Sequence, residues 1–500
     1  MTNIITYKRS TTLILVASPD WTNRDACGMV TRRVQDRARH DGERNTPVRP
    51  ASVSAADKTR FPRGARRAGR PRRWRFWWTV AAGAAVGSGL RGPDPAQAAS
   101  AWTPLCDLRA RQEILDGVYH FAPNDDRQWL RLRTRAGLRL QNGRHLGEVL
   151  LTNEHRHYLT PDDIAFDWDE VIIERAFWSW QATSAVRLTV GRQDIVWPGG
   201  FLMLDGTPLD GARTGYHNAV RVQTSGAAAD FDVALIHNPK RDPVVVIDDL
   251  DRAVGDADET ALAMRLVCGV WAWSFIYKDE RDPDVQLPDL TTATFAGRCD
   301  GAFANGGTWH GEMAVQYQHG RTAPLPALAP APDVRSAATG WALAADAGAS
   351  WPLDRHWSFT AGAFYYSGQS DDGRAFRTPW GRWPKWSDLY LYSLLGESRA
   401  GRSHVAAWEN IAAPHVTFSR PLGGRLTVLL RASWLLAPEP EWLARGCLTR
   451  AELTAVFSRR LQGHLLWETL FPGAFHDGRY GLPPLADTVH FVRWQLVWAL

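Results

Sequence analysis

Hydrophobic and polar positions alternate with a period of two along most of the chain from about residue 129 to residue 500. The clearest run is WLRLRTRAGLRL, from Trp129 to Leu140. One face of this run carries Leu130, Leu132, Thr134, Ala136, Leu138 and Leu140. The other face carries four arginines, Arg131, Arg133, Arg135 and Arg139. Because successive side chains of a β-strand point to opposite faces, the run predicts a strand with one apolar and one cationic side.

The same alternation returns at intervals, and no helical domain interrupts it. Further runs lie at 186–191, 220–223, 309–318, 425–431 and 492–500. Turn signals such as Asn142-Gly143 and Gly423-Gly424 separate them. Many short amphipathic strands predict an all-β fold, and one strand alone does not say which kind. A soluble sandwich would bury the apolar faces, whereas a transmembrane antiparallel up-and-down β-barrel would turn them to lipid and turn the arginines to a wet lumen.

The last run and the aromatic content favour the barrel. Trp494 and Trp498 lie on the apolar face of the run that ends at Leu500, and outer-membrane barrels commonly close with such a strand, which the barrel assembly machinery would recognise. The 25 Trp, 18 Phe and 11 Tyr suit the aromatic girdles of a membrane protein, although a Trp-rich carbohydrate-binding β-protein would also contain them. No run of 18 or more apolar residues follows residue 100, which argues against membrane-spanning helices.

Three segments break the alternation. Residues 262–277 are apolar on both parities. This predicts either a strand that is partly buried under a loop or an amphipathic helix within a loop. Residues 320–332 are rich in Pro and Ala and predict a loop. Residues 376–386, FRTPWGRWPKW, carry too many Pro and Trp for a spanning strand. We expect them to form a long extracellular loop or a plug element.

The first 98 residues precede the alternating region. A basic run from Arg66 to Arg75, an apolar run from Phe76 to Leu90 and the small residues Ala96-Gln97-Ala98 have the order of a secretory signal peptide. We assign residues 61–98 to this signal and residues 1–60, which are polar and unpatterned, to a misassigned start or a disordered extension. Residues 99–124 are expected to form a periplasmic segment, and residues 125–500 the barrel.

The net charge of +5 belongs to this leader. Residues 1–98 hold 19 of the 58 Lys and Arg and 7 of the 53 Asp and Glu, so residues 99–500 hold 39 basic and 46 acidic residues, a net charge of −7. The basic balance is therefore no argument for nucleic-acid binding. The five cysteines, Cys27, Cys106, Cys268, Cys299 and Cys447, are widely spaced and predict neither a zinc site nor a particular disulfide.

Signals for catalysis or metal binding are weak. His155 and His157 share a strand face, but a single His-x-His pair is more often an ordinary pair of histidines than a metal site. Asp162-Asp163 and Asp371-Asp372 fit solvated loop carboxylates better than calcium ligands. The sequence contains no Gly-x-Ser-x-Gly motif and no P-loop. We therefore expect no enzyme activity, no metal and no cofactor.

Four stretches resemble the alginate exporter family of outer-membrane porins. They are TNEHRHY at 152–158, ERAFWSW at 174–180, LTVGRQDI at 188–195 and LWETLFPGAF at 466–475. The resemblance covers roughly residues 125–500 and implies an 18-stranded monomeric barrel, with an alginate export domain whose arginine-lined lumen passes polyuronate. Arg192 matches the arginine of the family's Gly-Arg-Gln segment. The sequence departs from the family pattern at 197–215 and 376–386, so the resemblance does not fix the solute.

Lumen-facing arginines suit a carboxylated solute, because guanidinium stays charged at any pH and binds carboxylate bidentately. The expected lumen residues are Arg131, Arg133, Arg135, Arg139, Arg187, Arg192, Asp194 and Arg221. Acids such as Glu148 and Glu174 would weaken each site, so that a solute enters without being trapped. The prediction is a passive porin or exporter, embedded in the lipid of the bacterial outer membrane, for anionic polysaccharide or acidic oligosaccharide. The alternatives are a non-conducting surface or periplasmic carbohydrate-binding β-protein, a barrel-borne hydrolase, and a purely structural role for the arginines.

Overall fold

The structure is a computed structural model, and the residues that it describes lie between positions 100 and 500. The described ranges are 100–117, 126–160, 162, 170–204, 216–247, 257–284, 289–320, 339–354, 356–368, 374–381, 387–389, 410–439, 441–476 and 488–500. The predicted extension, the signal peptide and the Asp371-Asp372 pair lie outside these ranges. Within them, no helix is both long enough and apolar enough to cross a membrane.

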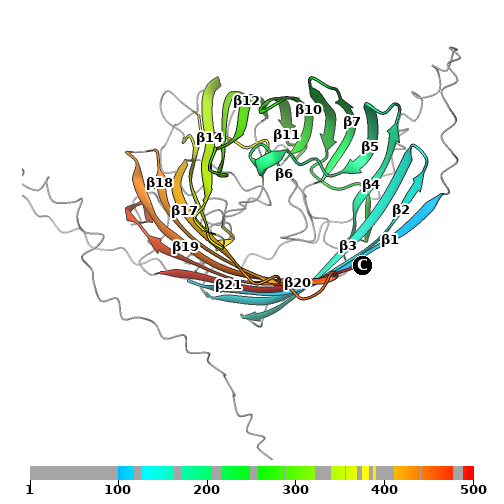
Figure 1. Cartoon of the computed structure of the whole chain (residues 1–500). Coiled ribbons are helices and arrows are strands. Elements are labelled where there is room, and N and C mark those ends of the chain that lie inside the picture. Colours follow the sequence, from blue (N-terminus) through cyan, green and yellow to red (C-terminus); the bar gives the residue numbers. More distant parts are fainter. Residues whose placement is uncertain are drawn as a thin grey trace, which may run out of the picture. The chain divides into compact units, whose positions relative to one another are not determined.

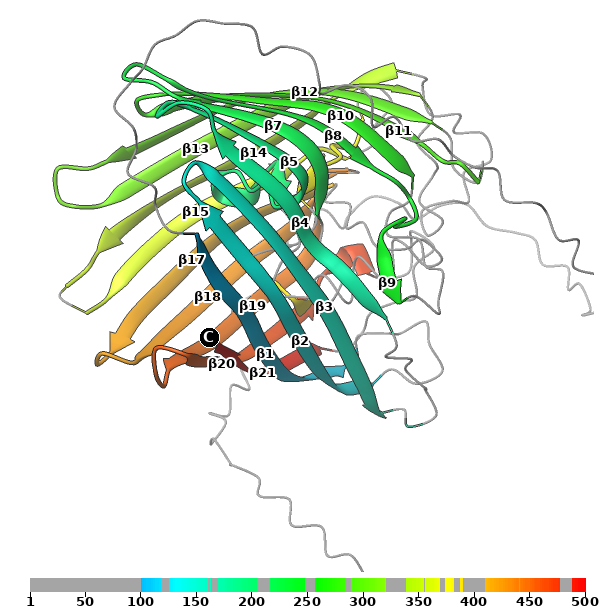
Figure 2. The same cartoon turned by 90° about the vertical axis from the view of Figure 1, so that its right-hand side faces the viewer.

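Eighteen of the described strands form a closed antiparallel β-barrel, in which β21 returns to pair with β1 (Figures 1 and 2). The strands of this barrel are β1 (Ala101–Asp116), β2 (Arg127–Asn142), β3 (His145–Thr160), β4 (Val171–Gln181), β5 (Val186–Gln193), β7 (His217–Ser225), β8 (Asp230–Asn238), β10 (Asp258–Cys268), β11 (Trp271–Arg281), β12 (Leu290–Ala302), β13 (Thr308–Gly320), β14 (Thr339–Pro352), β15 (Ser358–Tyr366), β17 (Ile411–Leu422), β18 (Leu426–Ala437), β19 (Leu443–Val456), β20 (Leu461–Pro472) and β21 (Val489–Ala499). The predicted fold class and the strand number implied by the resemblance are both confirmed.

The short connections and the C-terminal end of β21 lie at one end of the barrel, and the long connections lie at the other, because consecutive strands are antiparallel. Tight hairpins at Gly143, Gly269 and Gly423 use φ values of 54°, 59° and 72°, a region that glycine enters without steric cost. Outer-membrane barrels have their short turns on the periplasmic side, so the long connections are assigned to the cell exterior.

The barrel begins earlier than the sequence indicated. Residues 101–116, expected to belong to a periplasmic segment, form β1, which pairs with β2 and with β21. The alternation in β1 is hard to see because Pro104 and Gln112 interrupt its apolar face. Its opposite face is regular, and it carries charged side chains from Asp107 to Glu113. Strand β1 closes the sheet and so removes both of its edges.

Residues 262–277 form parts of two strands and not a single element. They belong to the hairpin of β10 and β11, with its turn at Gly269. The inward-facing side chains Ala263 and Ile276 are small or apolar, and they are buried in one cluster with Phe201 and Trp380 of the segments inside the barrel. The prediction of covered β-structure is therefore correct in kind, but the segment is a hairpin of two strands and not one strand, and the helix alternative is wrong.

The remaining elements lie outside the main ladder. They are the 3-10 helices η1 (Pro198–Gly200) and η3 (Ala474–His476), and the short strands β6 (Met203–Leu204), β9 (Val245–Ile247) and β16 (Trp380–Gly381). Strand β9 extends the sheet beside β4. Strands β6 and β16 pair with each other in parallel, and β6 lies inside the ring of barrel strands (Figure 1).

Candidate functional site

The two faces of each strand are inverted relative to a soluble protein. On β2, Leu132 is 51 % exposed, whereas Arg131 and Arg133 are 4 % and 2 % exposed. The same inversion recurs on the far wall, where Met313 is 59 % exposed and Gln316 is fully buried. A sandwich would bury the leucine and expose the arginines. The observed pattern is that of a barrel whose apolar exterior meets lipid and whose polar side chains face the lumen.

Two glutamates tie together arginines from three neighbouring strands. Glu154 Oε2 lies 3.0 Å from Arg109 Nη2, and Glu154 Oε1 lies 2.6 Å from Arg131 Nη2. Glu113 lies 3.3 Å from the same Arg131 and 3.0 Å from Arg493. All five side chains are at least nine-tenths buried. Ion pairs this deep stay intact only when each charge is matched, because desolvation of an isolated charge is costly.

The next two arginines of β2 share a second set of carboxylates. Asp107 accepts from Arg133 at 3.1 Å and also pairs closely with Arg135. Arg135 reaches Glu174 on β4 at 2.9 Å. Arg131, Arg133 and Arg135 therefore lie together on the inner wall, and each one is already paired with an acid of the same wall.

Arg139 lies nearer the end with the short turns and is more accessible. Its side chain is 45 % exposed and pairs with Glu148 at 2.7 Å. Glu148 also binds Arg175 at 3.0 Å, and Arg175 approaches Asp194 at 3.7 Å. The acids that the sequence placed among the arginines are thus present between them.

Arg187 and Arg221 occupy the neighbouring strands β5 and β7. Arg187 is exposed and donates to Gln181 at 2.9 Å. Arg221 is bound in a fork by Asp232, with hydrogen bonds of 2.8 and 2.6 Å. These two arginines are separated from the cluster on β2, so the predicted residues form a band around part of the wall and not one compact site.

Arg192, the arginine of the Gly-Arg-Gln segment, shares the parity of the outward-facing Val190 on β5, so the expectation that it lines the lumen is wrong. An acid from an external connection holds its side chain. Asp242 accepts two hydrogen bonds from it, at 3.0 and 2.7 Å, and the guanidinium lies 3.8 Å from the centre of the Tyr216 ring. Burial favours the neutral form of Asp242. The hydrogen bonds and charge of Arg192 outweigh that effect and hold the pKa of this carboxyl below its ordinary value.

Two segments between strands fold into the barrel and pack on each other. The first contains Phe201 and Met203 and follows β5, and the second contains Phe376 and Trp380 and follows β15. These four side chains are at most 5 % exposed, and the rings of Phe201 and Phe376 lie 6.4 Å apart. The plug interpretation of residues 376–386 is supported for 376–381, whereas 382–386 lie outside the described residues.

The wall beneath these segments is lined by small side chains. Those that are at most 5 % exposed include Ala234, Ala261, Ala263, Ala296, Ala314, Ala342 and Ala344. Their small size leaves room for a second layer of polypeptide. Trp380 donates to Glu259 at 2.9 Å, Lys278 donates to the carbonyl of Pro379 at 2.9 Å, and Gln316 donates to the carbonyl of Arg377 at 2.8 Å.

The connection after β15 also touches the opposite wall. Glu468 on β20 accepts hydrogen bonds from Ser387 Oγ at 3.0 Å and from the backbone N–H groups of Asp388 and Leu389 at 2.8 and 2.6 Å. Glu468 also binds Arg450 of β19 at 3.0 Å. The connection therefore contacts β10, β11 and β13 through 374–381, and β19 to β21 through 387–389. No local sequence pattern predicted the contacts with Glu468, because they join residues about 80 positions apart.

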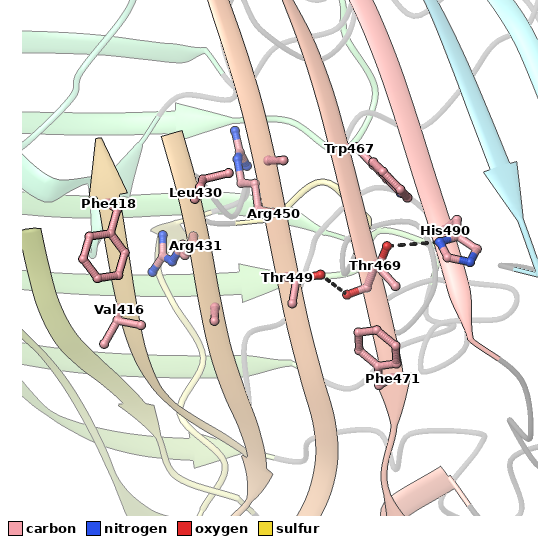
Figure 3. A pocket seen from close by; sticks show the side chains of 12 residues that line it. Val416, Phe418, Leu430, Arg431, Thr449, Arg450, Trp467, Thr469, Phe471 and His490 are labelled. Carbon is pink, nitrogen blue, oxygen red and sulfur yellow. Dashed lines mark hydrogen bonds between the residues drawn. The ribbon is translucent and has the colours of Figure 1, made fainter. Parts of the chain in front are cut away.

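A hollow of about 500 Å³ lies on the barrel wall across β17 to β21 (Figure 3). Phe418, Leu430, Trp467 and Phe471, which line it, are 38–53 % exposed and belong to the outward parity of their strands. The polar pair at its edge is Thr469 and His490, 3.0 Å apart. The aromatic and leucine side chains of the hollow belong to the apolar exterior, whereas Arg431 and Arg450, which also line it, lie on the inward parity of β18 and β19.

A metal site is not formed by the residues that the structure describes, among which no three His, Cys, Asp or Glu side chains come together. His155 and His157 lie on the outward parity of β3. Lys240, in the connection after β8, is held by two acids, Asp282 at 2.5 Å and Asp284 at 3.0 Å. Burial lowers the pKa of Lys240, but hydrogen bonds and charge from these acids raise it above its ordinary value.

No protein-family model matches the chain. No curated protein matches it in sequence. Among solved structures, OccAB1 of Acinetobacter baumannii is similar with a TM-score of 0.51 and 9 % identity, over 80 % of this chain and 96 % of that one. A BenF-like porin from Pseudomonas fluorescens Pf-5 has a TM-score of 0.49 and 11 % identity over 80 % and 98 % of the two chains. At such identities the likeness to OccAB1 shows the fold alone. The closed barrel and its exposed apolar exterior place the chain in the bacterial outer membrane.

Proposed function

We propose that the chain is a passive outer-membrane channel for small acidic solutes, with carboxylated sugars as the best-fitting class. The observation that carries this proposal is the inversion of the barrel wall, which turns arginines inward and leucines outward. Arg139 and Arg187 are the accessible cations of the predicted band, and they lie toward the end with the short turns. Guanidinium groups there would draw carboxylates into the lumen, and Glu148 beside Arg139 would weaken the contact so that the solute is released.

The inward segments bear on the size of the solute. Segments 195–204 and 374–381 fill the lumen next to β10–β14, so a solute would pass along the arginine-bearing side. This narrowing favours monomeric or short oligomeric acids. The resemblance to alginate exporters adds an anionic polysaccharide as a second candidate, because an extended polyuronate is also thin and carries a carboxylate on each sugar.

Planar-bilayer recording of the purified, folded protein tests the proposal. We expect discrete conductance steps, a reversal potential that shows anion preference in a KCl gradient, and a decrease in current when oligouronate is added. Neutral oligosaccharide of the same length serves as the control. Folded protein that binds uronate without conducting would support the carbohydrate-binding alternative, and the absence of any conductance would refute the channel.

A further inference from the structure

The carboxylate of Asp388 lies between two arginines of the barrel wall. Its Oδ1 is 2.6 Å from Arg493 Nη2 on β21, and its Oδ2 is 3.7 Å from Arg450 Nη1 on β19. The side chain of Asp388 is 12 % exposed. Two guanidinium groups that face the two oxygens of one carboxylate form an anion site, which an internal residue occupies in this structure.

The backbone around Asp388 is held independently of its side chain. Glu468 accepts hydrogen bonds from Ser387 Oγ and from the N–H groups of Asp388 and Leu389. None of these three bonds uses the Asp388 carboxylate. The charge of residue 388 can therefore be removed while the segment remains attached to the wall.

The two arginines also have partners on the wall. Arg450 binds Glu468 at 3.0 Å and Glu452 at 2.6 Å, and Arg493 binds Glu113 at 3.0 Å. They remain partly compensated if the carboxylate of Asp388 moves away, so its departure costs less than the loss of a sole partner would. Exchange of Asp388 for another carboxylate also preserves the charge of the site.

We propose that Arg450 and Arg493 form a carboxylate-binding site in the lumen, that Asp388 is its internal ligand, and that an acidic solute displaces Asp388 during passage. This inference rests on the proposed channel function and goes beyond it by naming a binding site on β19 and β21, formed by two arginines that the sequence analysis did not single out. The internal ligand lowers the affinity for the solute by competing with it. A channel needs such weak binding, because a tightly held solute would block the path.

Calorimetric titration of the detergent-solubilised full chain with D-glucuronate tests the inference. Asp388→Asn should bind glucuronate about tenfold more tightly than the wild type, which corresponds to about 1.4 kcal/mol. The matched control is Asp279→Asn, which removes the same charge from the outward parity of β11, where Asp279 pairs with Arg281. We expect that control to leave the affinity unchanged. Glucose, which lacks the carboxylate, should show no difference between the variants.

A second substitution tests whether the gain in glucuronate affinity depends on Arg450. In the Asp388→Asn background, Arg450→Gln should abolish the gain in affinity. Asp388→Ser is an alternative variant without the carboxylate, and heat-modifiable migration reports whether each variant is folded. Equal affinity of the wild type, both Asp388 variants and Asp279→Asn would overturn the inference, as would a gain that survives loss of Arg450.

The readout is binding, so it separates this inference from the channel proposal. A wild type that does not conduct, together with tighter glucuronate binding by Asp388→Asn, would leave the site standing and refute the channel. An anion-selective wild type whose Asp388 variants bind like the control would refute only the site.

Discussion

Loss of charge at Arg133 should mainly lower the stability of the barrel, whereas loss of charge at Arg187 should mainly change its ion selectivity. Arg133 is 2 % exposed and pairs with Asp107 at 3.1 Å. Removing one partner of a buried ion pair costs about 3–5 kcal/mol. Since Asp107 keeps Arg135 as a partner, we expect Arg133→Gln to lie near the lower end, at about 3 kcal/mol. Arg187 is exposed and makes a hydrogen bond to Gln181, so Arg187→Gln should change stability by only about 0.5 kcal/mol.

For ion selectivity, Arg187→Gln should have the larger effect of the two substitutions. A buried, paired arginine presents little of its charge to a passing anion, whereas exposed Arg187 presents most of it. Arg187→Gln should therefore shift the reversal potential in a KCl gradient toward zero, and Arg133→Gln should leave it nearly unchanged. Selectivity would thus depend on the exposed arginines, whereas the sequence pattern pointed first to Arg131 and Arg133.

Two measurements on each variant decide the matter. Urea unfolding followed by tryptophan fluorescence gives the stability, and bilayer recording gives the reversal potential. If Arg133→Gln costs no stability and shifts selectivity as strongly as Arg187→Gln, the assignment of structural and solute-facing arginines is wrong. Conservative replacement by Lys at each position controls for the loss of side-chain volume.

Three further predictions concern the exterior, the inward segments and one ion pair. Met313→Arg, in the middle of β13, should lower the free energy of unfolding by about 2–4 kcal/mol, because it places a charge at mid-membrane. His319→Arg, near the end of the same outward face, should lower it by at most about 1 kcal/mol. Equal losses, measured by unfolding in lipid vesicles, would contradict a lipid-facing β13. Trp380→Ala should increase single-channel conductance by loosening the inward segment, and unchanged conductance would show that the segment does not narrow the path. The lowered pKa of Asp242 means that its pair with Arg192 stabilises the protein above the ordinary aspartate pKa of about 3.9 and that this contribution is lost as pH falls through the lowered value. The wild type should therefore lose more stability on acidification than Asp242→Asn, and parallel pH profiles would contradict this.

The alternation of side chains was predictable because it is a local property of extended backbone. Leu132 and Arg133 must point to opposite faces of any strand that contains them. The repetition of that pattern over many short runs was enough for the fold class. At β1 the same reasoning failed, because Pro104 and Gln112 blur the apolar parity and only pairing with β2 and β21 identifies the strand.

The pairing of charges was beyond sequence reasoning. Glu154 meets Arg109, which is 45 positions away, and Arg493 meets Glu113 across the closure of the barrel, 380 positions away. Both contacts depend on the stagger between strands, which the turns and the ring closure set together. The exposed fractions that separate Arg133 from Arg187 follow from these pairings.

By itself the sequence determined the side of each strand that is apolar, and with it an all-β chain whose arginines share one face. Only the tertiary structure decided which arginines are already bound by acids and which remain accessible. It also decided that residues near Phe201 and Trp380 fold into the barrel over a wall of alanines. The physical reason is that face alternation is settled between adjacent residues, whereas burial and ion pairing depend on segments that meet only when the barrel closes.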